Sequence, residues 1–155
     1  MADCELTNMV MVHDKITNRV LVQERVRSWR GISFPGGHVE PFESFVDSAV
    51  REIYEETGLR VENLRLCGQV HWCHAESGRR YVVFLYKTSD FSGRLLEKTE
   101  EGRVFWANLS DLLASPPALP LARNFQKYIP LFLSDKYSEA FGLWTEADDS
   151  SLIYK

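Results

Sequence analysis

Three glutamates stand close together in the chain, at positions 52, 55 and 56, and their spacing indicates chemistry. If the segment is helical, side chains three and four residues apart share a face, and their like charges destabilise the helix. Arg51 can offset part of this repulsion, but one guanidinium cannot neutralise three acids. Hard divalent cations such as Mg²⁺ prefer carboxylate oxygens as ligands. The cluster therefore indicates either a magnesium site or a solvated charged face of a helix.

The residues around the glutamates predict a helix from about Phe45 to Thr57. Ser44 suits the N-cap, Asp47 follows it at the capping-box spacing, and Gly58 suits the position just past the helix end. The apolar stripe of this helix contains Val46, Ala49, Val50, Ile53 and Thr57. Because the glutamates fall on a different face, a core packed under the stripe would present them together.

From Gly37 to Leu59 the chain reads GHVEPFESFVDSAVREIYEETGL. This segment resembles the Nudix box, G-x5-E-x7-R-E-U-x-E-E-x-G-U, in which U is an aliphatic residue. The matching residues are Gly37, Glu43, Arg51, Glu52, Ile53, Glu55, Glu56, Gly58 and Leu59. One position departs, because relatives usually carry glycine before the first box glutamate and this chain carries Phe42. Without a glycine there, we expect a less sharply turned loop.

The resemblance implies an α/β fold, a Nudix-type α/β/α sandwich with a mixed β-sheet, forming a single domain over residues 1–155. It also implies hydrolysis of a nucleoside diphosphate linked to another group. Glu52, Glu55 and Glu56 would bind Mg²⁺ or Mn²⁺ with the backbone carbonyl of Gly37. Glu43 and Gly58 would be structural members of the box, with Glu43 bracing the loop.

Catalytic roles follow from the same resemblance. Arg51 would orient the glutamates. Metal-assisted cleavage of a phosphoanhydride also needs a group that takes the proton of the attacking water, either a box glutamate such as Glu52 or Glu56 or a loop carboxylate. Glu101 is the candidate loop acid, as catalytic group and metal ligand, and Glu100 is its rival.

Substrate contacts lie outside the box. Arg25 occupies a position at which relatives often carry a phosphate-binding arginine, with Arg27 and Arg30 as alternatives. Asn124 can offer a bidentate amide to a purine edge, as can Asn108. Phe34, Trp29 and Trp106 can stack on a base, although core packing is the alternative role for Phe34 and Trp106.

Residues that distinguish branches of the Nudix family favour one substrate class. No proline occurs between Leu59 and Pro116, whereas the ADP-ribose branch usually carries one some fifteen residues past the box. The chain most resembles the MutT-like branch, which hydrolyses nucleoside triphosphates, including 8-oxo-dGTP, to a monophosphate and pyrophosphate. The alternatives are hydrolysis of a dinucleoside polyphosphate or nucleotide sugar, and a non-catalytic domain that senses nucleotides.

Strand-like and helical segments alternate along the rest of the chain, which favours a mixed sheet between helices. Met9 to His13 and Val20 to Glu24 predict a hairpin, and Leu64 to His74 and Arg80 to Lys87 predict an antiparallel pair. The later predictions are a strand at 104–106, a short helix at 110–114, a helix at 121–133 that Pro130 ends or kinks, and a loosely ordered tail from about residue 145.

Composition limits the classes of partner. The formal net charge of −4 argues against binding to a nucleic acid polymer, which requires a basic face. The longest apolar run, Tyr81 to Tyr86, is far shorter than the roughly 20 residues of a membrane-spanning helix. Cys4, Cys67 and Cys73 form no Cys-x-x-Cys pair, and no secretory signal begins the chain, so we expect a cytoplasmic protein. The expected partner is a small nucleotide, and the oligomeric state is left open.

Overall fold

A mixed β-sheet runs through the middle of the molecule. The computed structural model describes residues 1–147 and 151–155. The strands are β1 Cys4–Asp14, β2 Arg19–Arg25, β3 Gly31–Ser33, β4 Leu59–Glu62, β5 Arg65–His74, β6 Arg80–Thr88, β7 Asp90–Gly93, β8 Lys98–Thr99, β9 Gly102–Asn108, β10 Glu139–Trp144 and β11 Ile153–Tyr154. The order across the sheet is β11-β10-β5-β6-β1-β2-β9-β8, with β3 paired to β2, and β4 and β7 form a separate pair. β1 is parallel to β6 and β10 is parallel to β5, which makes the sheet mixed.

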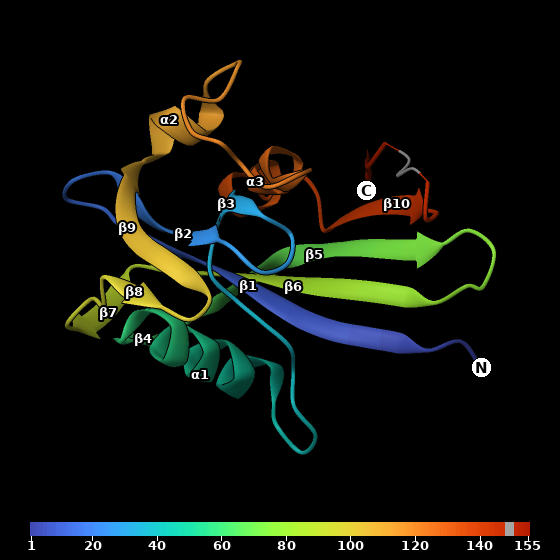
Figure 1. The fold of residues 1–155 in the computed structure, drawn as a ribbon, viewed down its shortest axis with the longest axis horizontal. Coiled ribbons are helices and arrows are strands. Elements are labelled where there is room, and N and C mark those ends of the chain that lie inside the picture. Colours follow the sequence, from blue (N-terminus) through green and yellow to red (C-terminus); the bar gives the residue numbers. More distant parts are fainter. Residues whose placement is uncertain (148–150) are drawn as a thin grey trace.

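Helices cover both faces of this sheet (Figure 1). Helix α1, Phe45–Thr57, lies on one side, and α2, Leu109–Leu113, and α3, Phe125–Leu133, lie on the other. The core is correspondingly divided into two clusters, one between the sheet and α1 and a larger one between the sheet and α3. This arrangement confirms the predicted α/β/α sandwich. Among the described residues, no helix is long and apolar enough to cross a membrane.

The predicted hairpin forms only near its turn. β1 and β2 pair at His13–Val20 and Asp14–Arg19, and beyond these pairs the two strands separate. The segment 35–37 enters beside β1, where the Asn8 N–H donates to the Gly37 carbonyl at 2.9 Å. β1 instead pairs with β6 over its length, a parallel contact between segments far apart in the chain. The separation of the strands makes room for the Phe-Pro-Gly-Gly loop next to α1.

Helix α1 matches its predicted bounds, because the signals at its two ends are local. The Ser44 hydroxyl accepts the Asp47 N–H at 3.0 Å, and Gly58 adopts φ 78° at the C-terminal end. The buried face differs slightly from the predicted stripe, since Val46 is exposed whereas Ser48 and Glu56 are buried. The helix is rotated so that Ser48 accepts a hydrogen bond from the Asn8 amide of β1, at 2.8 Å.

The C-terminal third differs more from the expectation. Helix α3 begins at Phe125 rather than at residue 121, because Asn124 has a left-handed backbone with φ 64°. Pro130 lies inside the helix without ending it before Leu133. The predicted loose tail is wrong for its final residues, since Ile153 and Tyr154 pair with β10. The middle of that tail, residues 148–150, lies outside the described residues.

Candidate functional site

Arg51 holds two of the glutamates of α1, Glu52 and Glu55. The Arg51 guanidinium donates to both oxygens of Glu43, at 2.7 and 3.0 Å. Its Nη1 also donates to Glu52 at 2.9 Å and to Glu55 at 3.1 Å, and its Nη2 donates to the His38 carbonyl. These hydrogen bonds lower the pKa of Glu43 to about 2, with a further contribution from the Glu40 N–H. Arg51 therefore ties the loop before α1 to the carboxylates on the helix.

Glu56 differs from its neighbours because it is buried, with 7% of its surface exposed. Burial raises its pKa to about 7, and the nearby Glu52 and Glu101 charges add to this effect. Two groups oppose the shift: the Arg25 charge and the Gly36 N–H, which donates to Glu56 Oε2 at 3.2 Å. Burial also raises the pKa of Glu52. Two partly desolvated carboxylates thus lie one turn apart on the helix.

The glycines of the loop let its backbone approach these carboxylates. A Cβ atom on Gly37 would lie 2.6 Å from Glu52 Oε1, and one on Gly36 would overlap the Asn8 carbonyl. The Gly37 carbonyl accepts the Asn8 N–H and retains a second lone pair. Phe42 adopts φ 67°, so the loop turns as sharply as one with glycine there, contrary to the expectation. Its side chain is fully exposed.

The donor set fits a hard divalent cation. Glu52, Glu55, Glu56 and the Gly37 carbonyl offer only oxygen atoms, and the first three carry the negative charge. Over residues 1–147 and 151–155, no group of three or more histidine, cysteine, aspartate or glutamate side chains is arranged to hold a metal ion, and Arg51 engages Glu52 and Glu55. Mg²⁺ keeps several waters and shares ligands with a phosphate, so it needs fewer protein ligands than a closed cage provides.

The two candidate loop acids are placed differently. Glu101 lies near enough to Glu56 for its charge to raise the pKa of that carboxyl. The Glu100 side chain is 86% exposed and the Glu101 side chain 36% exposed, and Arg27 pairs with both, at 3.4 and 3.5 Å respectively. Of the two, Glu101 is therefore the one that faces the glutamates of α1.

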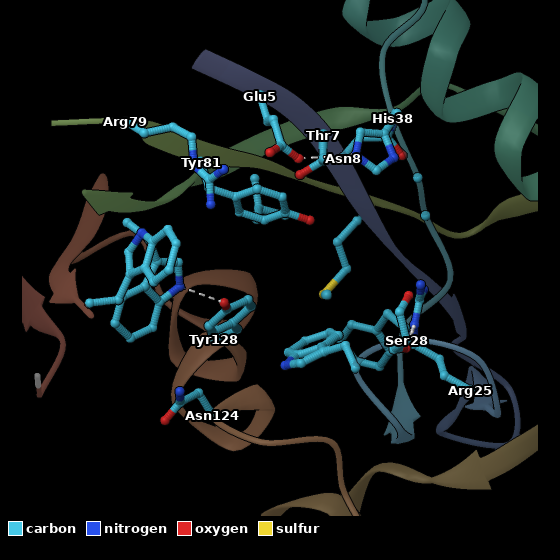
Figure 2. A pocket seen from close by; sticks show the side chains of 18 residues that line it. Glu5, Thr7, Asn8, Arg25, Ser28, His38, Arg79, Tyr81, Asn124 and Tyr128 are labelled. Atoms are coloured by element: carbon cyan, nitrogen blue, oxygen red, sulfur yellow. Dashed lines mark hydrogen bonds and ion pairs between the residues drawn. The ribbon is translucent and has the colours of Figure 1, made fainter. Parts of the chain in front are cut away.

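A cavity of about 470 Å³ opens beside these carboxylates, on the α3 side of the sheet. Arg25, Gly36, Gly37 and His38 form its edge nearest the glutamates. Aromatic rings form much of the remaining wall: Trp29, Phe34, Trp72, Tyr81, Tyr128 and Trp144. Figure 2 shows Arg25 and Ser28 at one side of this space, with Tyr81 and Arg79 at the other. A planar apolar group next to a polyphosphate would fit this arrangement.

Hydrogen bonds and ring contacts fix the cavity walls. The Trp72 indole N–H donates to the Tyr128 hydroxyl at 2.8 Å (Figure 2). The Trp29 and Tyr128 rings lie 5.7 Å apart, and Trp29 has a left-handed backbone with φ 48°. Asn124 lies at the same end of the cavity as Tyr128 (Figure 2). The walls combine residues from β1, β5, β6 and α3 with the β2–β3 loop.

The structure brings most of the proposed substrate residues to this cavity, but not all of them. Arg25, Phe34 and Asn124 line it, although Phe34 is completely buried against Phe125 and Phe132. Trp106 lies elsewhere, because alternation along β9 directs it to the α1 side, where its ring is 5.0 Å from Phe91.

One other sequence interpretation leads away from the cavity. The Asn108 amide donates to Asp111 at the start of α2. Sequence reasoning missed Tyr81, Tyr128 and Trp144, because no local pattern marks residues that meet only through the tertiary fold.

Comparison with known proteins finds relatives both in sequence and in fold. The family model described as "NUDIX domain" matches residues 7–132. The chain is 30% identical over 117 residues to the uncharacterized Nudix hydrolase YvcI of Bacillus subtilis, covering 73% of this chain and 71% of that protein. Over 40 residues it is 55% identical to YtkD of Bacillus subtilis, named as a proposed 8-oxo-dGTP diphosphatase, covering 26% of this chain and 25% of that protein. Its fold is similar to that of a MutT protein from Bacillus halodurans, with a TM-score of 0.78, 24% identity and 97% of each chain covered.

Proposed function

This chain belongs to the Nudix hydrolase family, whose members act on pyrophosphate bonds, and from that premise we propose that it is a nucleoside triphosphate pyrophosphohydrolase. The proposed reaction releases a nucleoside monophosphate and pyrophosphate and requires Mg²⁺, for which Mn²⁺ can substitute. The proposed substrate is a purine nucleotide such as 8-oxo-dGTP.

One observation carries the proposal: the aromatic cavity and the carboxylate cluster share a border. Arg25, Gly36 and Gly37 line the cavity, Gly36 donates to Glu56, and Gly37 lies against Glu52. A nucleotide with its base among the aromatic rings would therefore place its phosphates beside Arg25 and the glutamates. The length of a nucleoside polyphosphate suits this two-part site.

The protein groups have distinct roles in this proposal. A bound divalent cation would neutralise charge on the phosphate oxygens and acidify a water. Glu52, Glu55, Glu56, Glu101 and the Gly37 carbonyl are the groups that would hold it. Arg25 would pair with a phosphate, and Arg51 would keep the glutamates oriented. Glu56 or Glu101 would take the proton of the attacking water, since both lie in the cluster.

Base recognition falls to the cavity. The Trp29 and Tyr128 rings would contact the base, and the Asn124 amide would hydrogen-bond its edge. The YtkD resemblance supports an oxidised purine as the first substrate to test. A dinucleoside polyphosphate or a nucleotide sugar is the alternative substrate, and the same cavity would then accept its nucleoside half.

Product analysis in ¹⁸O-labelled water tests the proposal. Candidate substrates are 8-oxo-dGTP, the unmodified nucleoside triphosphates, a dinucleoside polyphosphate and a nucleotide sugar, each with Mg²⁺ and with EDTA. We expect a nucleoside triphosphate to give the highest kcat/KM, with monophosphate and pyrophosphate as products, and the label identifies the phosphorus attacked. Equal rates on every compound would contradict the proposed substrate class.

A glutamate substitution tests the carboxylate site within the same assay. Glu56→Gln keeps the size of the side chain but removes its charge, and we expect kcat to fall by about 10²-fold or more. Glu62→Gln, on the exposed side of β4, is the matched control and is expected to keep normal turnover. Tight nucleotide binding without any product from the native protein would instead favour a sensing domain.

A further inference from the structure

Gln23, in the middle of β2, has a buried side chain that the fold does not satisfy. Its surface is 0% exposed, and neither its amide nitrogen nor its amide oxygen has a hydrogen-bond partner among the described protein groups. Buried polar groups in folded proteins almost always find a partner, because an unpaired one is costly. Gln126 shows the usual case, since its amide donates to the Leu112 and Ala114 carbonyls at 2.9 Å.

Strand alternation shows where the Gln23 amide points. Val20 and Val22 pack in the cluster under α3, whereas Leu21 packs with Ala49 and Ile53 of α1. Odd-numbered residues of β2 therefore face α1, and Gln23 follows Leu21 on that face. Arg25, at the end of the same strand, lies close enough to Glu56 for its charge to lower the pKa of that carboxyl. Gln23 thus lies on the α1 side of the sheet, two residues along β2 from a neighbour of the candidate metal site.

A second unsatisfied group lies on the same face of the sheet. Gly102 of β9 is paired with both Arg25 of β2 and Thr99 of β8. Strand β8 contacts helix α1, which places Thr99 beside the same helix. The Thr99 hydroxyl is buried and has no hydrogen-bond partner among the described protein groups.

These observations indicate one shared partner rather than separate defects. An internal water is typically held by two to four polar groups that would otherwise be unsatisfied. We propose that Gln23 is a positioning residue of the carboxylate site: its amide holds an ordered water that also bonds Thr99 and the Glu56 carboxylate. The inference rests on the proposed function in one respect, namely that Glu56 helps to bind a divalent cation.

The water would orient a carboxylate that the backbone fixes at only one oxygen. Glu56 Oε2 accepts the Gly36 N–H, and the water would bond the other oxygen. Groups that orient metal-binding side chains in this way typically change metal affinity or activity by about 10–100-fold when removed. Gln23 would then affect cation binding without touching the cation or the substrate.

Mn²⁺ binding to the nucleotide-free protein, measured by electron paramagnetic resonance, tests this inference without relying on turnover. Gln23→Met preserves the length of the side chain and removes its polar atoms, and we expect the Mn²⁺ Kd to rise by about 10-fold. In turnover, kcat is expected to fall with little change in KM for the nucleotide. The matched control is Gln126→Met, which loses two hydrogen bonds near α2 and is expected to leave the Mn²⁺ Kd unchanged.

Thr99→Val provides an independent variant in case Gln23→Met folds poorly. It is expected to weaken Mn²⁺ binding as well, and the double variant is expected to be no weaker than Gln23→Met alone, because both residues hold one water. Native Mn²⁺ affinity in both single variants would overturn the inference while leaving the proposed function intact. If the unmodified protein binds no Mn²⁺, the metal site of the proposed function fails, and the role of Gln23 fails with it.

Discussion

Arg51 contacts both the loop before α1 and the glutamates on the helix, so its planar guanidinium matters as much as its charge. Lysine has a single ammonium group and cannot reproduce the two parallel hydrogen bonds to Glu43. We therefore expect Arg51→Lys to raise the Mg²⁺ concentration needed for half-maximal activity and to lower kcat by about 10–100-fold. A magnesium titration of activity measures both effects.

Arg60→Lys is the control for this substitution. Arg60 lies 5.1 Å from the centre of the Tyr54 ring, beyond the C-terminal end of the same helix, and has no contact with the glutamate cluster. Its variant is expected to show a native magnesium profile. If Arg51→Lys behaved like Arg60→Lys, the bidentate contact with Glu43 would have no part in orienting the site.

The glutamates of α1 were predictable from the sequence as a group, but their individual environments were not. Glu56 has 7% of its surface exposed, while the side chain of Glu55, its neighbour in sequence, is 56% exposed. Helix geometry sets the two side chains about 100° apart, with Glu56 on the side of the buried Ile53. The contacts that cover Glu56, with the Gly36 backbone and with the end of β2, depend on how the sheet is assembled.

At the scale of elements, the loop before α1 carries strain at Phe42. Its φ of 67° is unfavourable for a residue with a Cβ, and its fully exposed ring forms no packing contact that would compensate. Phe42→Gly removes the steric cost but adds backbone entropy to the unfolded chain. We expect a net increase of about 0.5–1 kcal/mol in the free energy of unfolding, measured by urea denaturation.

Phe42→Ala separates the backbone effect from the effect of removing an aromatic ring. Alanine keeps the Cβ and therefore the strain, so its variant is expected to match the native protein in stability. An equal gain from alanine and glycine would mean that the exposed ring, rather than the left-handed backbone, destabilises the native state.

The elements that sequence reasoning located correctly are those with local signals. Ser44 and Gly58 are the capping residues at the two ends of α1, so the signal for each end lies directly beside the helix. Other contacts join segments that are separated by many residues. They are the β1–β6 pairing, the entry of residues 35–37 beside β1, and the Trp72–Tyr128 hydrogen bond. No periodicity or turn signal in one segment specifies its distant partner, and so the cavity could not be outlined before the structure.

At the scale of the whole molecule, the buried Glu56 couples stability to pH. Its pKa in the folded state is about 7, above the ordinary glutamate value of 4.5. Between these values the unfolded chain releases the proton while the folded chain retains it, so the metal-free protein loses stability as pH rises. Glu43 has the opposite sign, because its folded pKa is about 2 and its contribution is lost only as pH falls below about 4.5. From pH 5 to pH 8 Glu43 therefore stays ionised in both states, and Glu52, whose pKa burial also raises, acts in the same direction as Glu56.

Urea denaturation in EDTA at pH 5 and pH 8 measures this coupling. We expect the free energy of unfolding to be lower at pH 8 by on the order of 3 kcal/mol, because burial raises the pKa of Glu56 from 4.5 to about 7. In Glu56→Gln, which cannot titrate, most of that difference is expected to disappear. Mg²⁺ is expected to stabilise the native protein more at pH 8 than at pH 5, because a cation binds the ionised carboxylate. Equal stabilisation at both pH values would mean that magnesium binding does not depend on the ionisation of Glu56. Glu52, Glu55 and Glu101 would then be the remaining candidate ligands.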